Sequence, residues 1–231
     1  MTTKAIDWAG AAAELDQHGC ALLPRLLDEN SCAAIRALSD DRDRFRSEVN
    51  MARHGYGLGV YRYFGYPLPD PIETLRTELY VPLAGIANRW AELLGSETRY
   101  PAEHALYLDR CSQAGQVRPT PLLLRYGAGD WNALHQDLYG EHVFPLQVAI
   151  LLSRPQLDFT GGEFVLTEQR PRMQSRPEVV LLKQGDAVIF PVRDRPVKGS
   201  RGWHRVNMRH GVSRLRSGER LTLGIIFHDA L

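Results

Sequence analysis

The chain has 231 residues, of which 44% are hydrophobic and 24% are charged, and its formal net charge is +1. This composition is typical of a globular protein with a sizeable core, and it excludes a polycation or a polyanion. The three cysteines include no CxxC pair, so neither a disulfide framework nor a cysteine zinc site is predicted. The N-terminus has no hydrophobic signal region, and no apolar run approaches the roughly 20 residues that span a bilayer. We therefore expect a cytoplasmic protein without membrane contact, with a single domain over residues 1–231.

The N-terminal part is predicted to be largely helical. Residues 6–18 are rich in alanine and other helix formers, and a short apolar strand is expected at 21–23. Asp28 is a plausible N-cap for a second helix, and Asp70-Pro71 begins a third one that runs toward Leu94. Residues 54–69 are rich in glycine and tyrosine. They predict a loop or irregular hairpin, which either packs its rings on the protein or forms a lid that stacks on a flat substrate.

From about Ala105 the pattern changes to short β-rich runs bounded by Gly, Pro, Asp and Asn. Regularly spaced strands without helices between them are typical of a sandwich or barrel. We therefore expect a mainly β fold, with residues 1–104 as helical support and residues 105–231 as the β core. The expected strands are 106–108, 122–126, 146–152, 162–167, 179–182, 187–190 and 221–227.

Two candidate metal ligands, His135 and Asp137, are separated by one residue in a predicted strand. Side chains two residues apart on a strand face the same side, about 6.5–7 Å apart at Cα, so both can reach one ion. A lone HxD pair is common by chance, and a third ligand is required from further along the chain. Two histidines and one carboxylate leave three positions of an octahedron open, which is the arrangement of non-haem Fe(II) oxygenases.

His210 is the preferred third ligand, and His204 is its alternative. His210 is predicted to open one strand, Ser217-Gly218 to form a turn, and Arg220 to open the last strand. Two adjacent antiparallel strands would then bring His210 and Arg220 to one end of the barrel. Arginine can hold the distal carboxylate of a metal-bound 2-oxo acid through a two-pronged pair, and Thr222 could add a hydroxyl. No arginine follows His204 at the same offset, so we expect His204 in a loop, near the substrate.

The order of these motifs resembles one enzyme superfamily. The HxD pair, Gly161-Gly162-Glu163-Phe164, the segment 185–190, and His210 with Arg220 ten residues later are similar to the 2-oxoglutarate/Fe(II)-dependent oxygenases. The wider segment 134–230 resembles a bacterial subgroup predicted to demethylate damaged nucleic-acid bases, in the manner of AlkB. The resemblance implies a double-stranded β-helix, or jelly roll, that uses Fe(II), 2-oxoglutarate and O2.

By this resemblance, His135, Asp137 and His210 are the iron ligands and Arg220 pairs with the 2-oxoglutarate carboxylate. Tyr126, at the end of the strand before HxD, is implied as a further contact to 2-oxoglutarate. Trp131 and Asn132, just before the ligand strand, are candidate substrate contacts. The chain departs from AlkB-type enzymes in one respect, because it has no clean Arg-x-Asn-x-Thr-x-Arg cluster.

Residues 193–220 form a basic stretch, with nine lysines and arginines against two acids. Such a stretch either meets a phosphate backbone or an acidic co-substrate, or is a solvated basic face. Three functions follow as hypotheses: oxidative demethylation of alkylated nucleic-acid bases, hydroxylation of a small molecule, amino acid or protein side chain, and a non-catalytic jelly-roll binding module. Salt dependence separates the first two, and copurifying iron separates both from the third.

Overall fold

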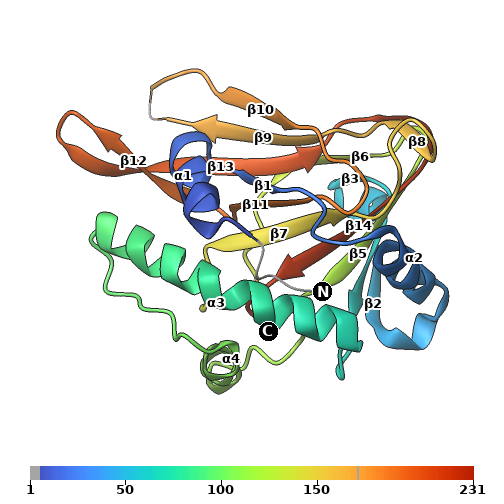
Figure 1. The fold of residues 1–231 in the computed structure, drawn as a ribbon, viewed down its shortest axis with the longest axis horizontal. Helices are drawn as coiled ribbons and strands as arrows, with labels where there is room; N and C mark the ends of the chain where they lie inside the picture. The colour runs from blue at the N-terminus through green and yellow to red at the C-terminus, as the bar shows by residue number, and fades with distance from the viewer. Residues whose placement is uncertain (1–5, 171) are drawn as a thin grey trace.

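The computed structural model describes residues 6–170 and 172–231, and in these residues helices pack on two antiparallel β-sheets (Figure 1). The elements in chain order are α1 (Trp8–His18), β1 (Ala21–Leu23), α2 (Glu29–Ala37), η2 (Leu38–Asp40), η3 (Arg42–Arg44), β2 (Phe45–Asn50), η4 (Met51–His54), β3 (Gly57–Leu58), β4 (Val60–Phe64), α3 (Asp70–Leu93), α4 (His104–Gln113), β5 (Leu122–Gly127), β6 (Trp131–His135), β7 (Leu146–Leu151), β8 (Phe159–Gly161), β9 (Phe164–Gln169), β10 (Arg176–Val180), β11 (Ala187–Pro191), β12 (Asp194–Gly199), β13 (Gly202–Val212) and β14 (Leu215–Ile226).

The two sheets confirm the expected mainly β fold, a double-stranded β-helix preceded by N-terminal helices. The larger sheet has eight strands in the order β1-β11-β7-β14-β5-β4-β2, with β8 attached to β14. The smaller sheet has six strands in the order β10-β9-β13-β6-β3, with β12 attached to β13. Strands β7 and β14 therefore lie in the middle of the larger sheet, and β13 lies in the middle of the smaller one.

Strand β7 shows how the core is divided into layers. All six of its residues are buried, as expected for a strand that is covered on both faces. Val148 and Ile150 belong to the core between the larger sheet and the helices. Ala149 and Leu151 belong to the core between the two sheets. Figure 1 shows α3 lying across the outer face of the larger sheet, so the order of layers is helices, larger sheet, smaller sheet.

The helix starts that the sequence predicts are confirmed. The Asp28 carboxylate accepts a hydrogen bond from the Ser31 backbone N–H at 2.7 Å, as an N-cap does. Helix α1 ends at Gly19, whose φ of 82° is left-handed and favours glycine. Helix α3 has proline in its first turn and continues through Pro82. None of the helices in the described part of the chain is long and apolar enough to cross a membrane.

Three expectations from the sequence are wrong. Residues 106–108 are not a strand but part of helix α4, whose buried residues His104, Tyr107 and Cys111 recur at helical spacing. Strand β13 begins eight residues before His210, so this histidine does not open it. Residues 217–218 are not a turn between strands, because β14 runs continuously from Leu215 to Ile226 and pairs with β8 there.

Residues 54–69 join both sheets. Within this segment β3 pairs with β6 of the smaller sheet, and β4 pairs with β2 and β5 of the larger sheet. Tyr56, Tyr61 and Tyr63 from this segment line the cavity between the sheets. The aromatic rings therefore form one wall of that cavity.

Candidate metal centre

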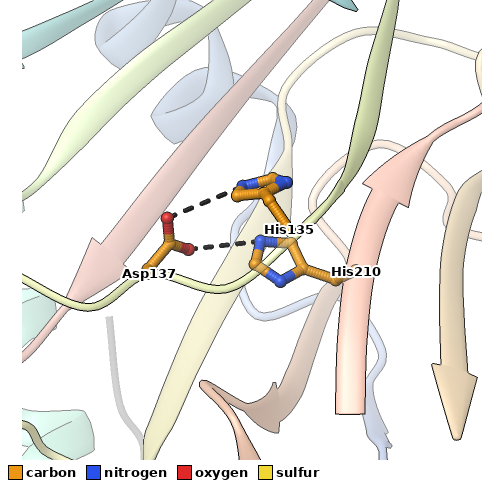
Figure 2. Close-up of side chains that lie close together, drawn as sticks. All are labelled: His135, Asp137 and His210. Carbon is orange, nitrogen blue, oxygen red and sulfur yellow. Dashed lines mark ion pairs between the residues drawn. The ribbon is translucent and has the colours of Figure 1, made fainter. Parts of the chain in front are cut away.

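The structure brings His135, Asp137 and His210 together, with ligand atoms that all lie within 4.8 Å of one another (Figure 2). His135 is the last residue of β6 and lies directly opposite His210 of β13 in the strand register. Asp137 follows two residues after the end of β6. One carboxylate oxygen of Asp137 lies 3.6 Å from His135 Nε2, and the other lies 3.2 Å from His210 Nε2. Three donor atoms from two paired strands and the segment after β6 therefore face one point.

Hydrogen bonds orient two of these side chains. His135 Nδ1 lies 2.8 Å from the Ala133 carbonyl oxygen, so this nitrogen carries the proton and Nε2 is free to bind a metal. The Tyr139 hydroxyl donates a hydrogen bond of 2.6 Å to Asp137 Oδ1. Sequence reasoning missed Tyr139, although its position two residues after Asp137 repeats the spacing of the HxD pair. His210 is held by packing, since the Phe190 ring lies 4.7 Å from its ring centre.

The protonation states of the triad suit metal binding. Burial alone would raise the pKa of Asp137, but His210, His135 and the Tyr139 hydroxyl together lower that pKa below its usual value. Burial lowers the pKa of His210, and the neighbouring His135 lowers it further. Neutral imidazoles and an ionised carboxylate are the forms that bind a cation.

Arg220 lies on β14, with 2% of its surface exposed. Its Nη1 donates a hydrogen bond of 2.6 Å to the Thr222 hydroxyl, which is its one hydrogen bond among the described residues, and its Nε is buried without a partner. Burial lowers the pKa of Arg220 to about 10, although Tyr126 and Glu163 oppose this shift. A buried guanidinium with free donors is an anion site.

The glycine pair before β9 makes room for Arg220. Gly162 has a φ of 65°, and a Cβ atom at this position would lie 3.1 Å from Arg220 Cδ and would also meet Leu215. Only glycine fits this close approach without displacing the arginine.

The two histidine ligands and Arg220 belong to different sheets, which corrects the expectation that adjacent strands carry His210 and Arg220. Strand β13 pairs with β6, β9 and β12, whereas β14 pairs with β5, β7 and β8. A cavity of about 480 Å³ between the sheets is lined by the triad, Arg220 and Thr222. The two halves of the site therefore face each other across the sandwich.

The other candidate residues separate into two groups. Tyr126 is buried in the cavity wall with its ring centre 5.8 Å from the Arg220 guanidinium, and its hydroxyl accepts a hydrogen bond from the Asn132 amide. Trp131 is 40% exposed and lies outside the residues that line the cavity. His204 lies on β13, opposite Val197 of β12, and not in a loop as expected. Its side chain is exposed and lies outside the ligand cluster.

A protein-family model matches residues 59–230, and its description reads "oxygenase, catalysing oxidative methylation of damaged DNA". The chain is also 55% identical over 180 residues to an uncharacterized protein of Mycobacterium tuberculosis, found in strains CDC 1551 and H37Rv. This match covers 76% of the chain and 77% of the relative.

Two solved structures share the fold at low sequence identity. One is an oxidoreductase of the 2-oxoglutarate/Fe(II) oxygenase family from Burkholderia pseudomallei, with a TM-score of 0.56, 19% identity, and coverage of 100% of this chain and 96% of that one. The other is a prolyl-4-hydroxylase of Pseudomonas putida, with a TM-score of 0.56, 15% identity, and coverage of 94% and 96%. The chain thus has the fold of the 2-oxoglutarate/Fe(II)-dependent dioxygenases, and it belongs to the oxygenase family whose description names damaged DNA.

Proposed function

We propose that this oxygenase removes N-methyl groups from alkylated bases in nucleic acid, with Fe(II) held by His135, Asp137 and His210 and 2-oxoglutarate held by Arg220. The observation that carries the proposal is the position of Arg220. A fully buried guanidinium without a carboxylate partner among the described residues lies across one cavity from a triad of metal ligands. This pair of features fits a co-substrate with a metal-binding end and an anionic end.

The residues fit both groups chemically. Two imidazoles and one carboxylate are the donor set that leaves open positions on ferrous iron. The guanidinium of Arg220 matches a carboxylate in shape and charge, and the Thr222 hydroxyl beside it adds a polar contact. When bound, iron and 2-oxoglutarate supply the oxidation of a C–H bond by O2. The chain contributes binding and orientation.

The chemistry of an oxygenase favours removal of a methyl group over its addition. Oxidation of an N–CH3 group consumes O2 and 2-oxoglutarate and gives N–CH2OH, succinate and CO2. The N–CH2OH group then breaks its C–N bond, which releases formaldehyde and returns the proton to the nitrogen. Addition of a methyl group would instead require a methyl donor, which an oxidation does not provide.

Two further observations support a nucleobase as the substrate. The cavity wall carries Tyr56, Tyr61 and Tyr63, whose flat rings suit a planar base that has been turned out of a nucleic-acid strand. Tyr56 is 49% exposed and so reaches the mouth of the cavity. The family description also names damaged DNA.

Succinate release tests the proposal. The protein is supplied with Fe(II), 2-oxoglutarate and O2 and offered N-methylated oligonucleotides, in parallel with a panel of amino acids and small metabolites. We expect methylated oligonucleotides to stimulate succinate and formaldehyde formation in equal amounts, and His135→Ala to remove both. Stimulation by an amino acid or a metabolite, but by no oligonucleotide, would show that the substrate assignment is wrong and the oxygenase chemistry right.

A further inference from the structure

We propose that the β12–β13 hairpin is a binding surface for the phosphate backbone of single-stranded nucleic acid, placed beside the catalytic cavity. This inference rests on the proposed function and names the surface that would hold its substrate. The hairpin consists of residues 194–212, including the two residues between the strands. Figure 1 shows it extending from the smaller sheet beyond the ends of the neighbouring strands.

The strand register sorts the side chains of the hairpin onto two faces. Lys198 lies opposite Trp203, and Pro196 lies opposite Arg205, so these side chains share one face. Arg209 follows Arg205 by four residues and belongs to the same face of β13. On the other face Val206, Met208, His210 and Arg195 are buried, whereas His204, nearer the end of the hairpin, is exposed.

The exposed positive charges of the hairpin have no ion-pair partner among the residues that the structure describes. Lys198, Arg201, Arg205 and Arg209 are exposed and make no ion pair within the described part of the chain. Asp194 is the one carboxylate on the hairpin, and it is paired with Arg193 at 2.9 Å. The remaining arginine of β12, Arg195, is buried against Glu168. Four exposed cations without ion-pair partners on a single hairpin suit a polyanion.

An exposed tryptophan lies among these cations, a combination that suits single-stranded nucleic acid. Trp203 is 40% exposed and lies directly opposite Lys198. Cations that follow a backbone, together with an aromatic ring on which a base can stack, are the elements of single-strand binding sites.

One residue of the surface also lines a groove that adjoins the catalytic cavity. Arg209 directly precedes the metal ligand His210 on β13, and the two side chains lie on opposite faces of that strand. Arg205 lines a groove of about 890 Å³, and Leu138 lines both this groove and the cavity that holds the triad. A nucleic-acid strand that runs along the hairpin and enters this groove would therefore come next to the cavity that holds the triad.

Fluorescence anisotropy with a labelled, unmethylated single-stranded DNA 15-mer tests the surface directly. The double variant Lys198→Gln/Arg205→Gln should bind at least about tenfold more weakly at low salt than the wild type. The slope of log affinity against log salt should fall by about 1.4, which is about 0.7 for each lost phosphate contact. The matched control Arg42→Gln/Lys183→Gln removes two exposed cations outside the hairpin and should bind like the wild type.

Further measurements separate the possible results. Trp203→Ala should weaken binding about tenfold or more with an unchanged salt slope, and Trp203→Phe should restore most of it. Wild-type binding that neither the double variant nor Trp203→Ala weakens would overturn the surface and leave the proposed function standing. A wild type that neither binds the 15-mer nor forms succinate with methylated oligonucleotides would overturn both. Binding to vesicles of anionic lipid, but not to DNA, would identify a membrane surface and overturn the proposal.

Discussion

Replacement of Arg220 by methionine is expected to have two opposite effects. It should remove the binding of 2-oxoglutarate, because the anionic end of the co-substrate loses its buried partner. It should not destabilise the protein without ligand, because the buried charge has no carboxylate partner among the described residues. Methionine is close to arginine in length and apolar, so the space beside Gly162 stays filled.

The change in stability and the change in affinity for 2-oxoglutarate both follow from the surroundings of Arg220. A fall in the pKa of Arg220 from 12.5 to about 10 corresponds to about 3 kcal/mol, at about 1.4 kcal/mol per pKa unit. At neutral pH this arginine is protonated in the folded and the unfolded chain, so the whole cost opposes folding. Its removal should raise Tm by up to about 10 °C, at about 2–4 °C per kcal/mol. Two charge-assisted hydrogen bonds to a carboxylate contribute about 3–6 kcal/mol, so the affinity for 2-oxoglutarate should fall at least about a hundredfold.

Thermal unfolding and calorimetric titration, both with Mn(II) in place of Fe(II) to prevent turnover, measure the two effects. Arg216→Met is the matched control, because Arg216 is exposed on the same strand four residues earlier. We expect Arg220→Met to unfold at the same temperature as this control or higher, and to lose the stabilisation that 2-oxoglutarate gives. A lower Tm together with unchanged affinity for 2-oxoglutarate would refute the reasoning.

Three other variants or conditions test the ligands and the core. Asp137→Ala should abolish succinate formation and the binding of iron, measured as metal content after purification. Tyr139→Phe should weaken metal binding about tenfold, measured by Mn(II) titration, because it removes the 2.6 Å hydrogen bond to Asp137. Burial, followed by the charge of Arg76, lowers the pKa of both His104 and His228 to about 3. The same two histidines take up protons near pH 6.5 in the unfolded chain. The free energy of unfolding should therefore decrease by up to about 3 kcal/mol per pH unit as the pH falls from 6.5 toward 3. Urea denaturation at pH 7 and pH 5 measures this loss.

The parts of the site that depend on short spacings could be predicted from the sequence. His135 and Asp137 are two residues apart and do converge, although β6 ends at His135 and Asp137 lies just beyond the strand. The choice of His210 over His204 came from Arg220, which follows it at a fixed offset. The ligand cluster contains His210, although the predicted reason, adjacent strands, is wrong, since β13 and β14 lie in different sheets.

Other features depend on contacts that no short segment encodes. Helix α4 has four apolar residues in a row at 105–108, a run that fits a strand and a helix equally well. The packing of Tyr107 and Cys111 against the core favours the helix. The β12–β13 hairpin contains few apolar residues and many charged ones. The alternation of apolar and polar residues that predicts a strand is therefore weak in this segment. The hydrogen bond from Tyr139 to Asp137 depends on the path of the chain after β6, which lies outside regular strands.

The division of the site between the two sheets has a mechanical consequence. His135 and His210 belong to the smaller sheet, and Arg220 belongs to the larger one. A co-substrate that is bound at both ends would link the two sheets, because the sheets could not separate without breaking its contacts at one end. At a concentration of 100 times its Kd, such a ligand stabilises the folded state by about 2.7 kcal/mol. Amide hydrogen exchange in β13 and β14 should therefore slow together when 2-oxoglutarate binds, although these strands share no backbone hydrogen bond.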